Sequence, residues 1–196
     1  LFELFAGNIG SEMDRSAAVY QLRNREARMN LLQSISKNVS STVKDQIKNA
    51  LEAVASFYSC EIGLISKIKN GKYHLEFKYD PESQLIIDKN INTADSLFGA
   101  TINKQDVTTL YNVDSTLNLQ TCFMDLPAKS YIGLPINVNG KPYGILCMVS
   151  SKKSMEPFLE MDNDFFNLLG SWVGNMLKRR ENESKLRKNE ENINRA

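Results

Sequence analysis

The chain has 196 residues, 42% of them hydrophobic, and a formal net charge of +1. This size allows one packed domain with extra helix, and the near-neutral charge argues against a nucleic-acid partner. No apolar run approaches the roughly 20 residues that cross a bilayer, and no signal-peptide pattern is present. Three widely spaced cysteines, Cys60, Cys122 and Cys147, favour a reducing cytoplasm over a disulfide framework or a zinc site.

The first 58 residues or so are predicted to be helical. No proline precedes Pro81, and apolar residues recur every four positions from Leu1 to Met13. A break is expected near residues 38–42, where Ser41 or Thr42 is suited to cap a second helix. Because the chain opens on an apolar helical pattern without Met, we expect it to derive from a longer protein.

A β-hairpin is predicted around Asn70-Gly71, because a two-residue type I′ turn needs positive φ at both positions. Strict alternation separates an apolar face from a charged face. The apolar face is expected to contain Ile62, Leu64, Ser66, Ile68, Tyr73, Leu75, Phe77 and Tyr79. His74, the single histidine, falls on the charged face, so neither a metal site nor a catalytic triad is indicated.

The middle of the chain carries weaker signals. Residues 80–92 are expected to form a loop and a short strand, followed by a short helix over 95–100. A strand is predicted over 107–113. An irregular segment that contains Cys122 then extends to residue 129.

A second hairpin is predicted around Asn139-Gly140, with Ile136 opposite Tyr143 and Leu134 opposite Ile145. Both faces are apolar, which is typical of a hairpin at the centre of a covered sheet. One face is expected to hold Ile132, Leu134, Ile136, Tyr143, Ile145 and Cys147. The other is expected to hold Tyr131, Gly133, Pro135, Gly144, Leu146 and Met148. The small residues of this second face either pack against a helix or loop or form the floor of a ligand cavity.

A long helix is predicted from about Asp162 to the end of the chain. When the chain is displaced by 164 residues, its start aligns with this helix without gaps, including Gly10 with Gly174 and Leu22 with Leu186. Such self-similarity favours a tandem array. Residues 1–32 are then the exit helix of an upstream domain, and residues 165–196 are the equivalent exit helix of the present one.

The segments SYIGLPINVNGKPYGILCMVS and EPFLEMDNDFFNLLGSWVGNMLKR follow a helix that leads into a strand pair. Over about residues 29–180 this arrangement resembles the GAF domain of bacterial sensory proteins. The resemblance implies an α+β fold with an antiparallel sheet of about six strands. Long N- and C-terminal helices are expected on one face, and loops and a short helix on the other face close a pocket. The expected division is an upstream exit helix and linker (1–32), a GAF domain (33–180) and a coiled-coil-like output helix (181–196).

The resemblance also implies a cytoplasmic, non-catalytic sensor module. It is expected to form a homodimer, to bind an unknown small molecule, and to signal to an output domain of the same chain, either a histidine kinase or a cyclic-di-nucleotide enzyme. No membrane segment is expected. The cofactor is unknown, because Cys122 lacks the following histidine of bilin-binding relatives, and the motifs of cyclic-nucleotide-binding and free methionine sulfoxide reductase relatives are missing. Two alternatives remain: a thiol redox sensor that uses Cys122 and a ligand-free dimerisation spacer.

Two sets of site residues follow from the faces of the central hairpin and from the resemblance. The predicted ligand pocket consists of Phe98, Cys122, Phe123, Tyr131, Gly133, Pro135, Gly144, Leu146 and Met148. The predicted dimer interface consists of Leu22, Phe165, Leu169, Trp172, Met176 and Leu186. The two leucines belong to a seven-residue repeat that suggests a helical seam.

Overall fold

A central antiparallel sheet organises the computed structural model, which describes residues 2–37, 42–82, 96–111, 128–151 and 158–194. Within these residues the sheet has five strands in the order β2-β1-β5-β4-β3. The strands are β1 (Ile62–Lys69), β2 (Lys72–Tyr79), β3 (Thr108–Leu110), β4 (Ser130–Val138) and β5 (Lys141–Ser150). The predicted α+β architecture is confirmed, with five described strands where about six were expected.

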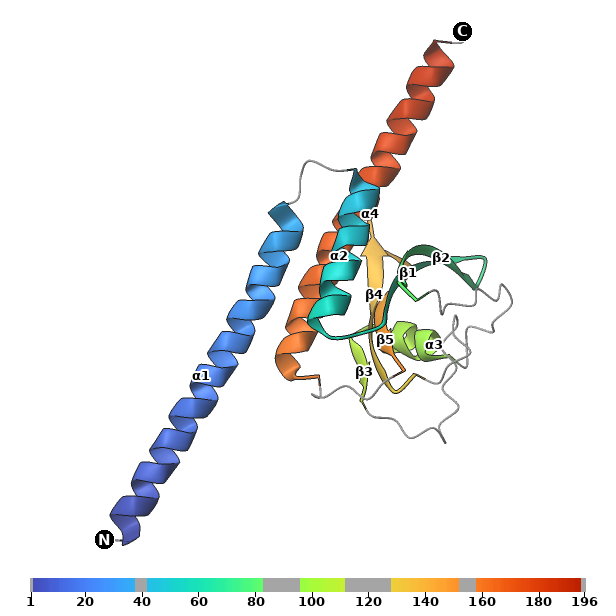
Figure 1. The fold of residues 1–196 in the computed structure, drawn as a ribbon. Helices are drawn as coiled ribbons and strands as arrows, with labels where there is room; N and C mark the ends of the chain where they lie inside the picture. Colours follow the sequence, from blue (N-terminus) through green and yellow to red (C-terminus); the bar gives the residue numbers. More distant parts are fainter. Residues whose placement is uncertain (1, 38–41, 83–95, 112–127, 152–157, 195–196) are drawn as a thin grey trace.

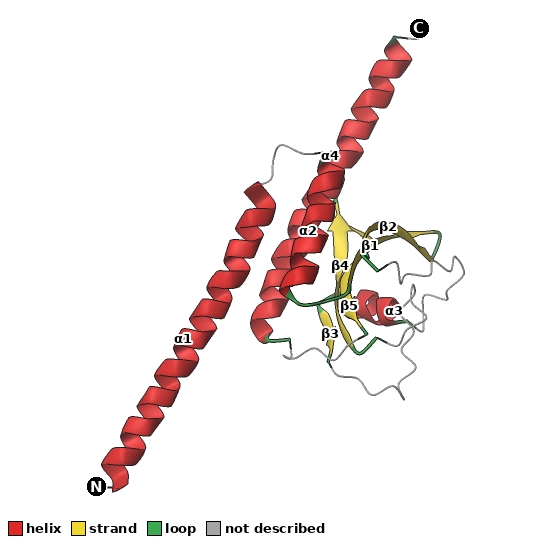
Figure 2. Cartoon of the chain, viewed as in Figure 1, coloured by secondary structure: helices red, strands yellow, loops and turns green. Residues whose placement is uncertain are grey.

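Helices cover both faces of this sheet (Figures 1 and 2). α2 (Val43–Phe57) and α4 (Glu160–Ile193) lie on one face, and α3 (Leu97–Lys104) lies on the other. α1 (Phe2–Lys37) lies outside α2 and α4. The amino-terminal part of α1 and the carboxy-terminal part of α4 project beyond the domain in opposite directions (Figure 1).

Local sequence signals explain several boundaries. Thr42 caps α2 as predicted, since its hydroxyl accepts a hydrogen bond from the Asp45 amide at 3.2 Å. Ser96 caps α3 in the same way by accepting from Gly99. Both hairpins turn at their Asn-Gly pairs, where Asn70 and Asn139 have φ of 54° and the following glycines also have positive φ.

The register of the central hairpin differs from the prediction. Val138 pairs with Lys141 as expected, but Ile136 pairs with Gly144, so Tyr143 is an extra residue in β5. This β-bulge places two consecutive residues opposite one and moves every later residue of β5 to the other face. The predicted faces of β5 are therefore exchanged.

The first hairpin contains a bulge of the same kind. Ser66 pairs with Leu75 while Ile65 pairs with Phe77, which leaves Glu76 as the extra residue of β2. Phe77 was predicted to share a face with Leu75. Instead it packs with Ile65 beneath the helices, whereas Leu75 packs on the α3 side.

Two apolar cores result, one on each side of the sheet. The larger core lies under α2 and α4 and includes Ile132, Leu134, Leu146, Met148, Phe166 and Val173. The smaller core lies under α3 and includes Ile62, Phe98, Tyr131, Ile145 and Cys147. Gly174 allows α4 to approach the sheet closely, because a Cβ atom there would lie 2.6 Å from the backbone oxygen of Asn137.

Gly144 lies against the neighbouring strand instead of under a cavity. A Cβ atom at this position would overlap the backbone oxygen of Ser66 in β1. Gly144→Ala is therefore expected to lower the free energy of unfolding by roughly 1–3 kcal/mol, the usual range for overpacking. Urea denaturation of the purified variants measures this change.

The control is Gly140→Asn, because a Cβ atom there meets nothing within 4 Å and asparagine tolerates positive φ. A Gly144→Ala variant as stable as the wild type would show that β1 and β5 are not so closely apposed.

Candidate functional site

The two bulge residues, Tyr143 and Glu76, point toward each other on the face of the sheet that α2 and α4 cover. The hydroxyl group of Tyr143 in β5 donates a hydrogen bond to the carboxylate of Glu76 in β2, reaching over β1. In between, the ammonium group of Lys67 in β1 lies 4.5 Å from the centre of the Tyr143 ring. Burial, reinforced by the hydrogen bond to Glu76, raises the pKa of Tyr143 well above its usual value. The phenol therefore stays protonated and remains a donor.

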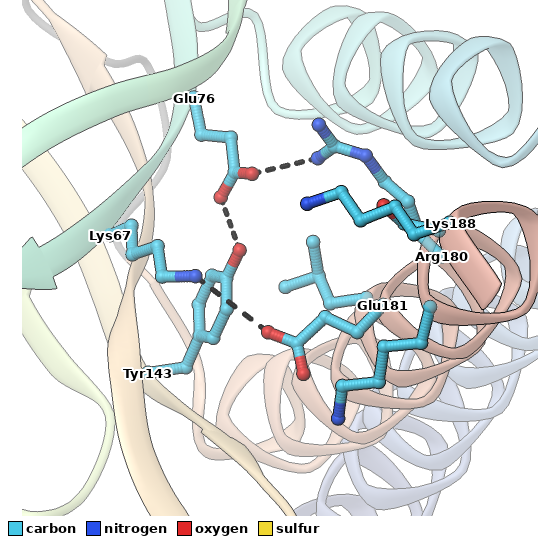
Figure 3. Close-up of a pocket in the computed structure, with 9 residues that line it drawn as sticks. Lys67, Glu76, Tyr143, Arg180, Glu181 and Lys188 are labelled. Carbon is cyan, nitrogen blue, oxygen red and sulfur yellow. Dashed lines mark hydrogen bonds and ion pairs between the residues drawn. The ribbon is translucent and has the colours of Figure 1, made fainter. Parts of the chain in front are cut away.

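α4 completes this cluster with charged side chains of opposite sign (Figure 3). Arg180 donates a hydrogen bond of 2.7 Å to Glu76, and its guanidinium group lies 5.2 Å from the centre of the Phe77 ring. Glu181 forms an ion pair with Lys67 at 3.6 Å. These side chains are partly solvated, so each pair contributes little stability alone. Together they connect three strands to the middle of α4.

A groove of about 400 Å³ lies beside these pairs, between the sheet and α4. Its lining is mostly polar and charged, with Leu177 as an apolar residue in the wall. The lining residues are Lys67, Glu76, Tyr143, Leu177, Arg180, Glu181, Ser184, Lys185 and Lys188. No local sequence pattern predicted this groove, because its lining residues come from three strands and α4.

A second cluster connects α1 to the beginning of α4. The guanidinium group of Arg28 in α1 contacts Asp162 Oδ1 through Nε and Nη2, both at 2.6 Å. The side chains are 12% and 2% exposed, so this is a buried ion pair. Tyr58, just after α2, donates a hydrogen bond of 2.6 Å to the same carboxylate oxygen. Three helices therefore meet at one carboxylate.

Asp162 also caps α4. Its second carboxylate oxygen accepts a hydrogen bond of 2.5 Å from the backbone amide of Leu159. The guanidinium group of Arg28 lies 5.8 Å and 5.9 Å from the ring centres of Phe57 and Tyr58. Burial alone lowers the pKa of Arg28, but the hydrogen bond to Asp162 and the further interactions with Tyr58 and Asp162 outweigh it, so the net shift is upward. We call Arg28, Tyr58 and Asp162 the helix clamp.

The comparisons with known proteins identify the fold family. The model of the GAF domain family matches residues 42–177, which is more than half of the chain. The chain belongs to the GAF domain family. No functionally curated protein matches the chain.

Solved GAF structures have the same fold at low sequence identity. The GAF domain of a putative sensor histidine kinase from Pseudomonas syringae pv. tomato is 17% identical, with a TM-score of 0.63, covering 88% of this chain and 99% of that chain. The GAF domain of a phosphoenolpyruvate-protein phosphotransferase from Coxiella burnetii is 14% identical, with a TM-score of 0.62, covering 83% and 99%. The free methionine-R-sulfoxide reductase from Neisseria meningitidis is 14% identical, with a TM-score of 0.60, covering 80% and 90%. These likenesses establish the fold alone.

The predicted ligand pocket is divided between the two faces of the GAF sheet. Phe98 and Tyr131 lie together on the α3 face, fully buried, with ring centres 6.5 Å apart. Gly133 lies under the Tyr131 ring, and Pro135 pairs with Ile145 of the same face. Their grouping follows the prediction, although Tyr131 occupies the space over Gly133.

The remaining pocket residues do not join this group. Leu146 and Met148 pack beneath α2 and α4, because the bulge at Tyr143 exchanges the faces of β5. Gly144 shares their face and is covered by the backbone of β1. Their assignment to the pocket was wrong for this physical reason. Cys122 and Phe123 lie outside the described residues.

The predicted dimer residues also separate into two groups. Phe165 and Leu169 are 2% and 1% exposed because they pack into the core of their own chain, so the interface prediction is corrected at both positions. Trp172 and Met176 are partly buried beside that core. Leu22 and Leu186 are 59% and 63% exposed and remain available to a partner.

Other functional predictions have limited support in the described residues. Cys60 and Cys147 are buried, and burial raises the pKa of the Cys60 thiol to about 12. His74 is exposed, as expected. Within the described ranges, no group of three or more His, Cys, Asp or Glu side chains is arranged to hold a metal ion. None of the described helices combines the length and apolar character that a bilayer crossing requires.

The helix clamp yields a stability prediction. Arg28→Met leaves the Asp162 charge buried without its cation, and such a loss typically costs about 3–5 kcal/mol. Adding Asp162→Asn to this variant is expected to cost less than the sum of the two single changes, since no unpaired charge remains. Urea denaturation of the four proteins measures the coupling.

The matched control is Arg25→Met, which removes an exposed arginine from the same helix. Equal effects of Arg25→Met and Arg28→Met would refute the clamp.

Proposed function

We propose that this GAF domain is the regulatory part of a signalling protein and couples the helix before it to the helix after it. The observation that carries this proposal is the helix clamp, in which Arg28 of α1 holds the capping residue of α4. The projecting ends of α1 and α4 provide connections on opposite sides of the domain (Figure 1). Solved GAF domains of sensor histidine kinases have the same fold, which is consistent with a sensor role.

The proposed signal passes along α4 through two regions of contact. The clamp holds the first turn of α4, and the pairs of Arg180 and Glu181 with the sheet hold its middle. Between them, residues such as Phe166 and Val173 are buried against the sheet. A shift of the core or of α1 therefore acts on a helix that is fixed to the domain over half its length. The solvated part after Glu181 transmits the change.

Hydrogen exchange tests this coupling. In Arg28→Met, amides of residues 182–193 are expected to exchange severalfold faster than in the wild type, because α4 is less firmly held. Arg25→Met is the control and should leave these amides unchanged. Exchange by mass spectrometry with peptide resolution is the measurement. Faster exchange confined to residues 160–166 would refute transmission along α4.

The proposed assembly is a homodimer in which exposed apolar residues of α1 and α4 form a helical seam. On α4, Leu186 and Ile193 share one exposed side, since seven residues make almost two complete turns, and Leu168 lies on the same side about five turns before Leu186. Leu168, Leu186 and Ile193 are 52%, 63% and 74% exposed. On α1, Val19, Leu22 and Met29 are also exposed and have the three- and seven-residue spacings of a coiled-coil seam.

Sedimentation measures the dimer. Changing Leu22 and Leu186 to Asp is expected to weaken association more than tenfold, because burying one leucine contributes roughly 1.5–3 kcal/mol. The control combines Ala17→Asp and Asn192→Asp, which add the same charge to exposed positions outside the apolar stripes. Circular dichroism should show an intact fold in both variants. A wild-type monomer at tens of micromolar, or equal effects of the two double variants, would contradict the seam.

A small-molecule ligand on the α3 face, a tandem array, the output domain and a cytoplasmic location stay predictions. The prediction of a ligand on this face rests on Phe98 and Tyr131, which lie together beneath α3. The hydroxyl of Tyr131 lies 2.8 Å from that of Thr101 in α3, so a ligand that enters here must displace or adjoin this pair. The proposed module has no catalytic role of its own.

A further inference from the structure

The groove between the sheet and α4 contains more positive than negative charge. Four cationic side chains line it, from Lys67, Arg180, Lys185 and Lys188, against the two carboxylates of Glu76 and Glu181. The formal charge of the lining is therefore +2. Ser184 adds a hydroxyl group that is able to donate a hydrogen bond.

Both carboxylates are already engaged. Glu76 accepts hydrogen bonds from Tyr143 and Arg180, and Glu181 is paired with Lys67. In contrast, Lys185 and Lys188 have no acidic partner within 4.0 Å among the described residues. Figure 3 shows Lys188 and Arg180 extending from α4 toward the sheet. The uncompensated charge thus lies on the α4 side of the groove.

We propose that this groove binds a small dianion of the phosphate class, either inorganic or as the phosphate group of an ester. The ammonium group of lysine and the guanidinium group of arginine bind phosphate more strongly than other side-chain groups. The guanidinium group often does so through two parallel hydrogen bonds. A groove of about 400 Å³ falls within the range of small-molecule sites. The hydrogen bonds of Tyr143 and Arg180 hold Glu76, which reduces its repulsion of an anion.

The bound anion also connects the sheet to α4. Lys67 belongs to β1, whereas Lys185 and Lys188 lie on α4 one to two turns after Arg180. A dianion between them pulls the first solvated turns of α4 toward the sheet. The groove lies on the opposite side of α4 from Leu186, so an anion and a partner helix can bind together. This site is separate from the α3 face, where the ligand pocket was predicted.

Pyrophosphate is the first probe, because it carries several negative charges in a small volume. The titration is done in 150 mM chloride, so that the screening of charges is close to physiological. Titration followed by ¹⁵N amide shifts is expected to saturate, with the largest shifts at Lys67, Tyr143 and residues 180–188. Inorganic phosphate and adenosine monophosphate distinguish the source. Tighter binding of the nucleotide indicates an ester, and equal binding indicates the bare anion; both support the site.

Lys185→Gln combined with Lys188→Gln is expected to weaken pyrophosphate binding at least tenfold. The control, Lys48→Gln combined with Lys178→Gln, removes the same charge from exposed positions outside the groove and should bind like the wild type. All four changes are at solvated side chains, so the fold should persist. Non-saturating shifts spread over all lysines, or equal losses in the two double variants, would overturn the proposal.

Discussion

The bulge at Tyr143 decides which side chains of β5 enter which core. One additional residue in a strand exchanges its faces, because side chains alternate with a period of two. Leu146 and Met148 consequently support α2 and α4, while Ile145 and Cys147 support α3. The Tyr143 ring points toward α2 and α4, and its hydroxyl group donates a hydrogen bond to Glu76. The composition of the two cores therefore depends on this additional residue and on the matching bulge at Glu76 in β2.

The helix clamp is the second structural constraint, and it acts on the helices instead of the sheet. Asp162 is nearly fully buried and has three partners: the guanidinium group of Arg28, the hydroxyl group of Tyr58 and the backbone amide of Leu159, just before α4. A buried charge with several good partners is tolerated, whereas one that loses a partner is strongly destabilising. In the proposed function, α1 is therefore a sensitive contact of the GAF domain, because a movement of Arg28 would disturb the start of α4.

α4 has a buried side and an exposed side, and the proposed function uses both. One side carries Phe166, Val173 and Leu177 into the core, and the groove continues along the same side. The other carries Leu168, Leu186 and Ile193 into solvent. In the proposed function, the buried side of α4 moves with the core of the domain, and the exposed side packs against a second copy of the chain. An anion in the groove would change the contacts of the buried side of α4 with the sheet and would leave the exposed side accessible to a second copy.

The sequence by itself determined the elements, the turns and the family. Asn-Gly pairs, the Thr42 cap and apolar periodicity are local signals, and each corresponds to an observed boundary. Phe98 and Tyr131 were expected together and lie together in the core under α3, and the unbroken alternation of β4 puts Tyr131 on that face. Leu22 and Leu186, predicted as dimer residues, are exposed in the structure, and their role in a dimer stays a prediction.

Only the tertiary structure decided the bulges, the clamp and the groove. An inserted bulge residue carries no sequence mark that distinguishes Tyr143 or Glu76 from a regular strand residue. Arg28 and Asp162 are 134 positions apart, and neither differs in sequence from an ordinary exposed helix residue. Long-range pairs of this kind depend on how the helices pack on the sheet. That packing depends on the total burial of both cores, which no local pattern encodes.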